Sequence, residues 1–337
     1  MSSISPPRGP LLALLTLIVA VFVLRAFLSV PPDGSAGVER FVSRPQISML
    51  TFNLWFYAEK MRERMQALGQ IIHELQPDIL TFQEVTPDNF ALLKEQRWFS
   101  RYYLIPADDF GKQGRSSLVI LSAFPVDKWF IYTFKNPPPN RKLVIAEAKA
   151  AALTKSMKFV IGTAHLAHAG YNTRLRELQL NESLTLLSVY DNVCLMGDMN
   201  IEHKVDGDII LPWAWIDAWL FIPGNTNSNG YTWDRSKTPF TLARERSVNA
   251  TSYQARLDRV FCKLSDLKVK ELRIVGDKLS KSGVIPSDHF GLFTVIQPSV
   301  KTGSQKHNEI SKTEKYVYFK RPFNWEKLVQ QELSRLR

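Results

Sequence analysis

Short apolar runs alternate with stretches of helical periodicity between residues 46 and 297. Apolar side chains recur every three or four positions over residues 61–75, which predicts an amphipathic helix that Pro77 would end. A second helix is expected over residues 173–190. Apolar, β-branched runs bounded by turn residues are typical of buried strands. Such runs occupy residues 47–54, 79–85, 118–122, 143–153, 159–163, 193–196, 257–262, 269–275 and 292–296. Mixed strands and helices over this length predict one large α/β domain with packed sheets.

A different pattern fills residues 11–30, a largely apolar run in which Arg25, near the end, is the one charged residue. The full run matches the roughly 20 residues that span a bilayer, so the leading prediction is a single membrane anchor. The part before Arg25 alone would suit the core of a signal peptide that is cleaved near residues 34–36. A buried core helix is the third alternative.

The charges that flank this run predict its orientation. Arg8 precedes it with no acid nearby, whereas Asp33 and Glu39 offset Arg40 and Arg44 after it. Because positive charge favours the cytosolic side, the N-terminus is expected in the cytosol and the body across the membrane. The localisation predicted is therefore a single-pass membrane protein of unknown organelle.

The chain divides into five parts on these patterns. The predicted parts are an N-terminal flank (1–10), a transmembrane or signal-anchor helix (11–30), a linker (31–45), the α/β domain (46–297) and a C-terminal region (298–337). The last begins as a polar linker and ends in a basic amphipathic helix for which Asn324 is a plausible N-cap. That helix would either dock on its own domain or bind an anionic membrane.

Composition changes this picture only a little. With 45% apolar and 22% charged residues, the chain is neither wholly disordered, nor collagen-like, nor a polytopic transporter. The net charge of +11 resides largely in the terminal regions, so it does not by itself establish a polyanionic partner. The two cysteines, Cys194 and Cys262, lie in apolar strands and are expected to be buried, inert thiols.

Polar side chains suited to metal and phosphate chemistry follow several predicted strands. Glu84 follows the second strand, and Asn53 ends the first; carboxylate and amide oxygens are ligands for hard cations. Gly197 lets a strand turn so that Asp198 and Asn200 project from the sheet, where they can accept a proton from water and donate to a nucleophile or phosphoryl oxygen. An ordinary strand end and an Asx turn are the structural alternatives.

Two histidines extend this set. His165 follows a strand and is interpreted as a phosphate donor, whereas His168 stays unassigned. His289 needs a carboxylate partner, which would fix its tautomer and favour its cationic form. Asp258 lies early in a strand between arginines, so a structural salt bridge is its alternative role.

Six motifs in this order resemble the endonuclease/exonuclease/phosphatase superfamily, and within it most of all the 5′-tyrosyl-DNA phosphodiesterases. They are Thr51-Phe52-Asn53-Leu54-Trp55, Phe82-Gln83-Glu84-Val85, Gly162-Thr163-Ala164-His165-Leu166, Gly197-Asp198-Met199-Asn200, Arg256-Leu257-Asp258-Arg259-Val260-Phe261 and Ser287-Asp288-His289-Phe290-Gly291-Leu292. The resemblance implies a four-layer α/β/β/α sandwich, as in deoxyribonucleases, with a site at one edge. Two departures are Glu202, where a basic residue is expected, and Ala167-His168 after His-Leu.

The resemblance also implies a cofactor and its ligands. Mg²⁺, with Mn²⁺ as an alternative, would be held by Glu84, aided by Asn53 and Asp288. No structural zinc is expected, because no cluster of Cys and His has zinc-site spacing.

Catalytic roles follow in the same way. Asp198 would deprotonate the attacking water, which Asn200 would position. His289, held by Asp258, and His165 would stabilise the charge of a phosphorane-like transition state.

The predicted function is Mg²⁺-dependent phosphodiester hydrolysis, with 5′-tyrosyl-DNA or related DNA ends as substrate. Trp233 would stack on a base or on the tyrosyl ring, and the basic residues Arg235, Arg244 and Arg246 would contact the polyanion. A membrane-tethered phosphoesterase for phospholipid or phosphoinositide headgroups is the first alternative, and an inactive membrane-bound interaction module is the second. The predicted partners are this substrate and, through residues 11–30, a membrane; no protein partner is inferred.

Overall fold

A computed structural model describes residues 46–105, 117–135, 141–149, 158–169, 172–238 and 254–299, together with the backbone of 318–320. The predicted anchor (11–30) and the predicted C-terminal helix after Asn324 lie outside these residues. No helix within the described parts is both long and apolar enough to cross a bilayer. The membrane anchor therefore stays a prediction.

Sheet A contains six strands in the order β14-β15-β1-β2-β4-β3. Their bounds are Leu267–Val275, Gly291–Pro298, Ile47–Asn53, Ile79–Val85, Ser117–Ser122 and Tyr103–Ile105. β1 and β2 are parallel and are connected through helix α2 (Met61–Leu75). The helix ends where predicted, because Gln76 adopts a left-handed conformation and Pro77 cannot continue the helix. The two strands therefore end at the same edge of the sheet.

Sheet B has the order β10-β13-β8-β7-β6-β5. Its strands span Trp215–Asp217, Asp258–Leu264, Asn192–Asp198, Lys158–His165, Lys142–Lys149 and Val126–Thr133. β7 and β8 are parallel, with helix α4 (Thr173–Leu187) between them in the chain, and β13 runs antiparallel to β8. The end of β8 is thus adjacent to the end of β7 and to the start of β13.

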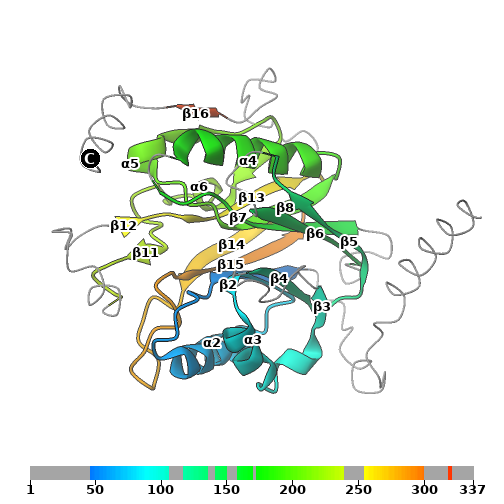
Figure 1. Cartoon of the computed structure of the whole chain (residues 1–337). Helices are drawn as coiled ribbons and strands as arrows, with labels where there is room; N and C mark the ends of the chain where they lie inside the picture. The colour runs from blue at the N-terminus through cyan, green and yellow to red at the C-terminus, as the bar shows by residue number, and fades with distance from the viewer. Residues whose placement is uncertain are drawn as a thin grey trace, which may run out of the picture. The chain divides into compact units, whose positions relative to one another are not determined.

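The apolar side chains form three layers of contact around these sheets. Between the sheets, Met49 and Ile79 of sheet A belong to the same buried cluster as Ile161 and Met196 of sheet B. The outer face of sheet A packs on α2 and α3 (Pro87–Lys94), and that of sheet B packs on α4. Figure 1 shows α2 and α3 on one side of the paired sheets and α4 on the other. The predicted α/β/β/α sandwich is confirmed.

The apolar pattern does not predict several short elements. They include a 3₁₀ turn (Phe99–Arg101), α5 (His203–Asp206), α6 (Ala218–Phe221), β9 (Asp208–Ile210), β11 (Trp233–Asp234), β12 (Gln254–Ala255) and β16 (Tyr318–Lys320). Strand β5 is not predicted from the apolar pattern either, because it is an edge strand whose residues 127–130 are exposed. The strand expected to reach residue 153 is described only to Lys149.

The expectation of two inert thiols is wrong. Cys194 of β8 and Cys262 of β13 are directly paired in the antiparallel register and form a disulfide, with Cα atoms 4.2 Å apart. Both residues are fully buried between the sheets. Cys194 lies four residues before Asp198, and Cys262 lies four residues after Asp258. The disulfide therefore fastens together the two strands that carry these acids.

We expect the double variant C194A/C262A to be less stable than the wild type. A cross-link between residues 68 positions apart restricts the unfolded chain, so its loss should lower the free energy of unfolding by about 2–4 kcal/mol. Denaturant unfolding under non-reducing conditions measures this difference. Ready alkylation of both cysteines in the denatured wild type without reductant would contradict the bond.

Candidate active site

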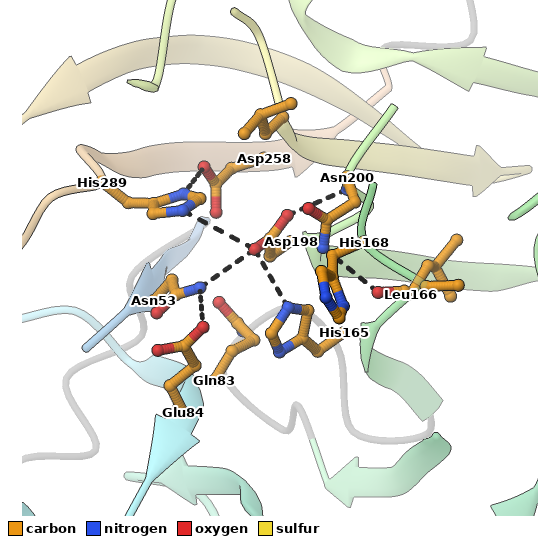
Figure 2. Close-up of polar contacts among 12 residues, drawn as sticks. Asn53, Gln83, Glu84, His165, Leu166, His168, Asp198, Asn200, Asp258 and His289 are labelled. Carbon is orange, nitrogen blue, oxygen red and sulfur yellow. Dashed lines mark hydrogen bonds and ion pairs between the residues drawn. The ribbon is translucent and has the colours of Figure 1, made fainter. Parts of the chain in front are cut away.

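The predicted site residues meet where the ends of β1 and β2 approach the ends of β7 and β8 (Figure 2). The register places His165 beside Asp198 across β7 and β8, and Asp258 beside Asp198 across β8 and β13. Direct hydrogen bonds and ion pairs link Asn53, Glu84, His165, Asp198, Asn200, Asp258 and His289. Residues up to 236 positions apart thus form a single polar cluster.

Asp198 is the centre of this cluster, with 1% of its surface exposed. Its Oδ2 accepts a hydrogen bond from Asn53 Nδ2 at 2.9 Å and lies 3.2 Å from His165 Nε2. Its Oδ1 accepts from the backbone N–H of Asn200 at 2.9 Å. Burial alone would raise the pKa of Asp198, but the interactions with His165 and His289 and these hydrogen bonds lower it. Asp198 is therefore ionised at neutral pH.

Local backbone conformation places Asp198 and Asn200. Gly197 has φ +142°, and a Cβ atom there would collide with the carbonyl oxygen of Ala164 on the neighbouring strand, so glycine is required. Asn200 adopts a left-handed conformation with φ 52° and donates from Nδ2 to the carbonyl oxygen of Leu166 at 3.1 Å. The Asx turn considered as an alternative is present, because Asp198 accepts the Asn200 N–H, and it coexists with the polar cluster.

His289 and Asp258 form a buried ion pair. His289 Nδ1 is 2.8 Å from Asp258 Oδ2, while Nε2 faces Asp198 Oδ2 at 3.8 Å. Burial favours the neutral imidazole, but Asp258 and Asp198 outweigh it and raise the pKa of His289 well above 6.5. Burial raises the pKa of Asp258 to about 6, so both partners are charged at neutral pH. Asp258 and Asp198 thus hold a positively charged imidazolium at the edge of the two sheets.

The pKa of His165 shifts in the opposite direction from that of His289. Its side chain is buried, and burial together with the charge of Arg141 lowers its pKa to about 3. The neutral ring therefore faces Asp198 as an N–H donor at 3.2 Å. The single N–H of the neutral ring is thus directed at Asp198, and the predicted role of His165 as a phosphate donor stays a prediction.

Glu84 lies at the other end of the cluster, on a bulge at the end of β2 where the pairing with β4 shifts register. Its φ of 57° is unusual for a residue other than glycine. Oε1 accepts from Asn53 Nδ2 at 3.3 Å, and Oε2 accepts from the backbone N–H of Phe56 at 3.0 Å. Asn53 Oδ1 in turn accepts the N–H of Trp55 at 3.0 Å. Asn53 thus orients the Glu84 and Asp198 carboxylates.

The donor set around Glu84 suits a divalent cation. Desolvation, followed by the negative charge of Asp288, raises the pKa of Glu84 to about 7, and desolvation also raises the pKa of Asp288. Two carboxylates that destabilise each other are stabilised when a cation binds between them. This chemistry fits the predicted metal position at Glu84 and Asp288, whereas Asn53 faces Glu84 with its amide nitrogen and supports the position by orienting that carboxylate.

A second group among the described residues has metal-like geometry. Asp198, Asp258 and His289 each offer a ligand atom, and these atoms lie within 4.8 Å of one another. A histidine binds metal through a deprotonated ring nitrogen, whereas Asp258 and Asp198 keep His289 protonated. The group is better suited to hold charge than to ligate an ion.

Arg141, which no sequence motif revealed, also belongs to this region. It precedes β6, and its Nη2 lies 3.3 Å from Nδ1 of the unassigned His168. Burial lowers the pKa of Arg141, while Asp198 and Glu84 counteract that shift. Because a lone arginine at the start of a strand has no distinctive pattern, only the fold identifies it.

The alternative of a salt bridge between Asp258 and its neighbouring arginines is wrong. Arg256 donates to Asp217 at 2.8 and 3.0 Å, and Arg259 donates to the same carboxylate at 3.2 Å. The two arginines and Asp217 are at least nine-tenths buried and hold β10 against β13. Because both arginines pair with Asp217, Asp258 forms its ion pair with His289.

The predicted substrate contacts are only partly visible. Trp233 is half-buried and forms an isolated bridge with His289, so it lies beside the cluster. Arg235, which is predicted to contact the polyanion, is 3% exposed, so little of its side chain is accessible to a substrate. Arg244 and Arg246 lie outside the described residues.

Comparison with known proteins agrees with this arrangement. Residues 50–289 match the endonuclease/exonuclease/phosphatase family. The chain is 24% identical to 5′-tyrosyl-DNA phosphodiesterase of Caenorhabditis elegans over 255 residues, which cover 73% of this chain and 66% of that protein, slightly less than two thirds. It is 23% identical to tyrosyl-DNA phosphodiesterase 2 of Bos taurus over 282 residues, or 80% of this chain and 73% of that protein.

Solved structures show the same fold. TDP2 of D. rerio, in complex with a single-stranded DNA product, superimposes with a TM-score of 0.64 at 20% identity, covering 75% of this chain and all of that one. TDP2 of C. elegans also gives 0.64 at 20% identity, covering 88% of this chain and 95% of that one.

We expect substitution of Glu84 by Gln to change stability and metal binding together. A carboxyl whose pKa is raised from 4.5 to about 7 on folding destabilises the metal-free fold as the pH rises through that interval. Relative to E84Q, the metal-free wild type should lose on the order of 2 kcal/mol between these pH values, discounted for partial exposure. Denaturant unfolding in EDTA measures this, and parallel pH profiles would contradict it. Mg²⁺ should raise the Tm of the wild type more than that of E84Q.

Proposed function

The chain belongs to the endonuclease/exonuclease/phosphatase family, and from this premise we propose that it is a divalent-metal-dependent phosphodiesterase acting on 5′-tyrosyl-DNA or related DNA ends. The observation that supports the chemistry most strongly is the ionised, buried Asp198 held between neutral His165 and cationic His289. This arrangement combines a proton acceptor with hydrogen-bond donors at one point.

Each residue of the cluster then has a definite task. Asp198 accepts the hydrogen bond of the attacking water and takes its proton as the bond to phosphorus forms, while Asn200 positions that water. The imidazolium of His289 stabilises negative charge on the phosphoryl oxygens, while the N–H of His165 orients the carboxylate of Asp198. Mg²⁺ held by Glu84, with Asp288 and Asn53, would supply positive charge to the phosphate and the leaving oxygen.

The substrate assignment rests on the relatives and on leaving-group chemistry. The two relatives reported above are named 5′-tyrosyl-DNA phosphodiesterase and tyrosyl-DNA phosphodiesterase 2. A phenolate leaving group, whose parent pKa is about 10, needs little protonation as it departs.

A membrane-tethered phosphoesterase for lipid headgroups is the second candidate. The Cys194–Cys262 disulfide favours it, because stable disulfides are typical of oxidising compartments. With the anchor predicted at residues 11–30, the bond supports a single-pass protein whose body lies outside the cytosol. Such a location would give the site access to lipid headgroups or to extracellular nucleic acid rather than nuclear DNA.

We expect D198N to lower kcat by about 1000-fold or more, because the base is replaced by an isosteric neutral amide. The rate is measured with Mg²⁺ on a 5′-tyrosyl oligonucleotide and on phosphoinositide headgroups. D266N is the matched control, since Asp266 pairs with Asn192 at the opposite end of β8. Wild-type release from headgroups alone would reject the DNA assignment, and full activity of D198N would reject the mechanism.

The pH profile tests the His289–Asp258 pair. A histidine with a raised pKa keeps its positive charge to higher pH, so kcat/KM should fall only as the pH rises well above 6.5. Removing the negative charge in D258N lowers the pKa of His289 and should shift this fall to lower pH. Identical alkaline limbs in both proteins, measured at saturating Mg²⁺, would show that the pair does not control the rate.

A further inference from the structure

Two aromatic side chains stand exposed beside the metal carboxylate. Phe56 and Tyr57, which we call the aromatic ledge, are 43% and 37% exposed. Their ring centroids are 4.4 Å apart and their planes differ by 28°, so the rings are stacked. The sequence motif that ends at Trp55 did not include them. Exposed aromatic pairs are unfavourable in water and are common at binding sites.

A buried arginine builds the loop that presents the ledge. Arg64 of α2 is 0% exposed, and its guanidinium donates to the carbonyl oxygens of Leu54, Trp55, Tyr57 and Glu59. It also lies over the Trp55 ring, 4.6 Å from the centroid. Burial lowers the pKa of Arg64 to about 10, so it remains cationic. The loop backbone is fixed before any ligand binds.

The hydrogen bonds place the ledge on one side of the reacting centre. Phe56 N–H donates to Oε2 of Glu84, while the opposite oxygen of that carboxylate faces Asn53, which bridges to Asp198. Along this series of contacts Phe56 follows Glu84, and Asp198 lies at the other end. Because the attacking and leaving oxygens lie in line across phosphorus, water activated at Asp198 expels the leaving group toward Glu84.

We propose that the aromatic ledge binds the planar ring of the leaving group, the phenol of the tyrosyl substrate, and so selects aryl over alkyl phosphodiesters. This inference rests on the proposed phosphodiesterase function and names the specificity residues of that site. Stacking of a planar ligand requires accessible aromatic surface, which the partly exposed rings of Phe56 and Tyr57 provide.

The test compares two substrates: the leaving group of one has an aromatic ring, and that of the other has none. One oligonucleotide carries a 5′-tyrosyl phosphodiester, and the other a 5′-trifluoroethyl phosphodiester, whose leaving group is acidic but has no ring. The variant F56A/Y57A should lower kcat/KM about 10-fold or more on the tyrosyl substrate and less than about 2-fold on the trifluoroethyl substrate. Both substitutions keep the backbone N–H that holds Glu84.

The control is W129A, which removes a ring that is also 43% exposed but lies on edge strand β5. Equal losses on both substrates would overturn the ledge as a leaving-group site. If the loss of kcat/KM in F56A/Y57A disappears when the first nucleotide of the substrate is abasic, the ledge binds a nucleobase instead. That result would also overturn the ledge as a leaving-group site. A wild type inactive on both substrates would reject the proposed function itself, whereas an active wild type with an unchanged variant would reject only the ledge.

Discussion

The hydrogen bond from Asn53 to Asp198 joins the two sheets at the rim, and the site depends on it. Asn53 ends a strand of sheet A and Asp198 ends a strand of sheet B, with their side chains 2.9 Å apart. The same amide nitrogen reaches Glu84, so one side chain sets the distance between the Asp198 and Glu84 carboxylates. The packed interior between the sheets holds this spacing, because close-packed cores resist small displacements.

The interior of the fold and most of the cluster could be predicted from the sequence, because buried strands show continuous apolar runs and because Glu84, Asp198 and His289 follow or precede such runs. Three features could not. Pairing of Asp217 with Arg256 and Arg259 depends on the sheet order, which leaves no local signal.

The disulfide and the exposed edge strand could not be predicted from the sequence for related reasons. Cysteines in apolar strands have the same pattern whether they are reduced or bonded, and only the register of β8 against β13 brings Cys194 opposite Cys262. Strand β5 lacks the alternation expected of a half-buried strand because it lies at the edge of its sheet. Pairing between distant segments, rather than local propensity, decides all of these features.

Electrostatic balance connects the cluster with the ledge. Asp258 and Asp198 hold His289 in its cationic form, whereas desolvation, followed by the negative charge of Asp288, raises the pKa of Glu84. Cation binding is therefore favoured at Glu84, and a leaving oxygen that gains negative charge is best stabilised there. A ring attached to that oxygen must project beyond Glu84, and the next residues along the hydrogen-bond series are Phe56 and Tyr57. In the proposed mechanism, the charge distribution that favours cleavage toward Glu84 would thus also direct the leaving group to the aromatic surface.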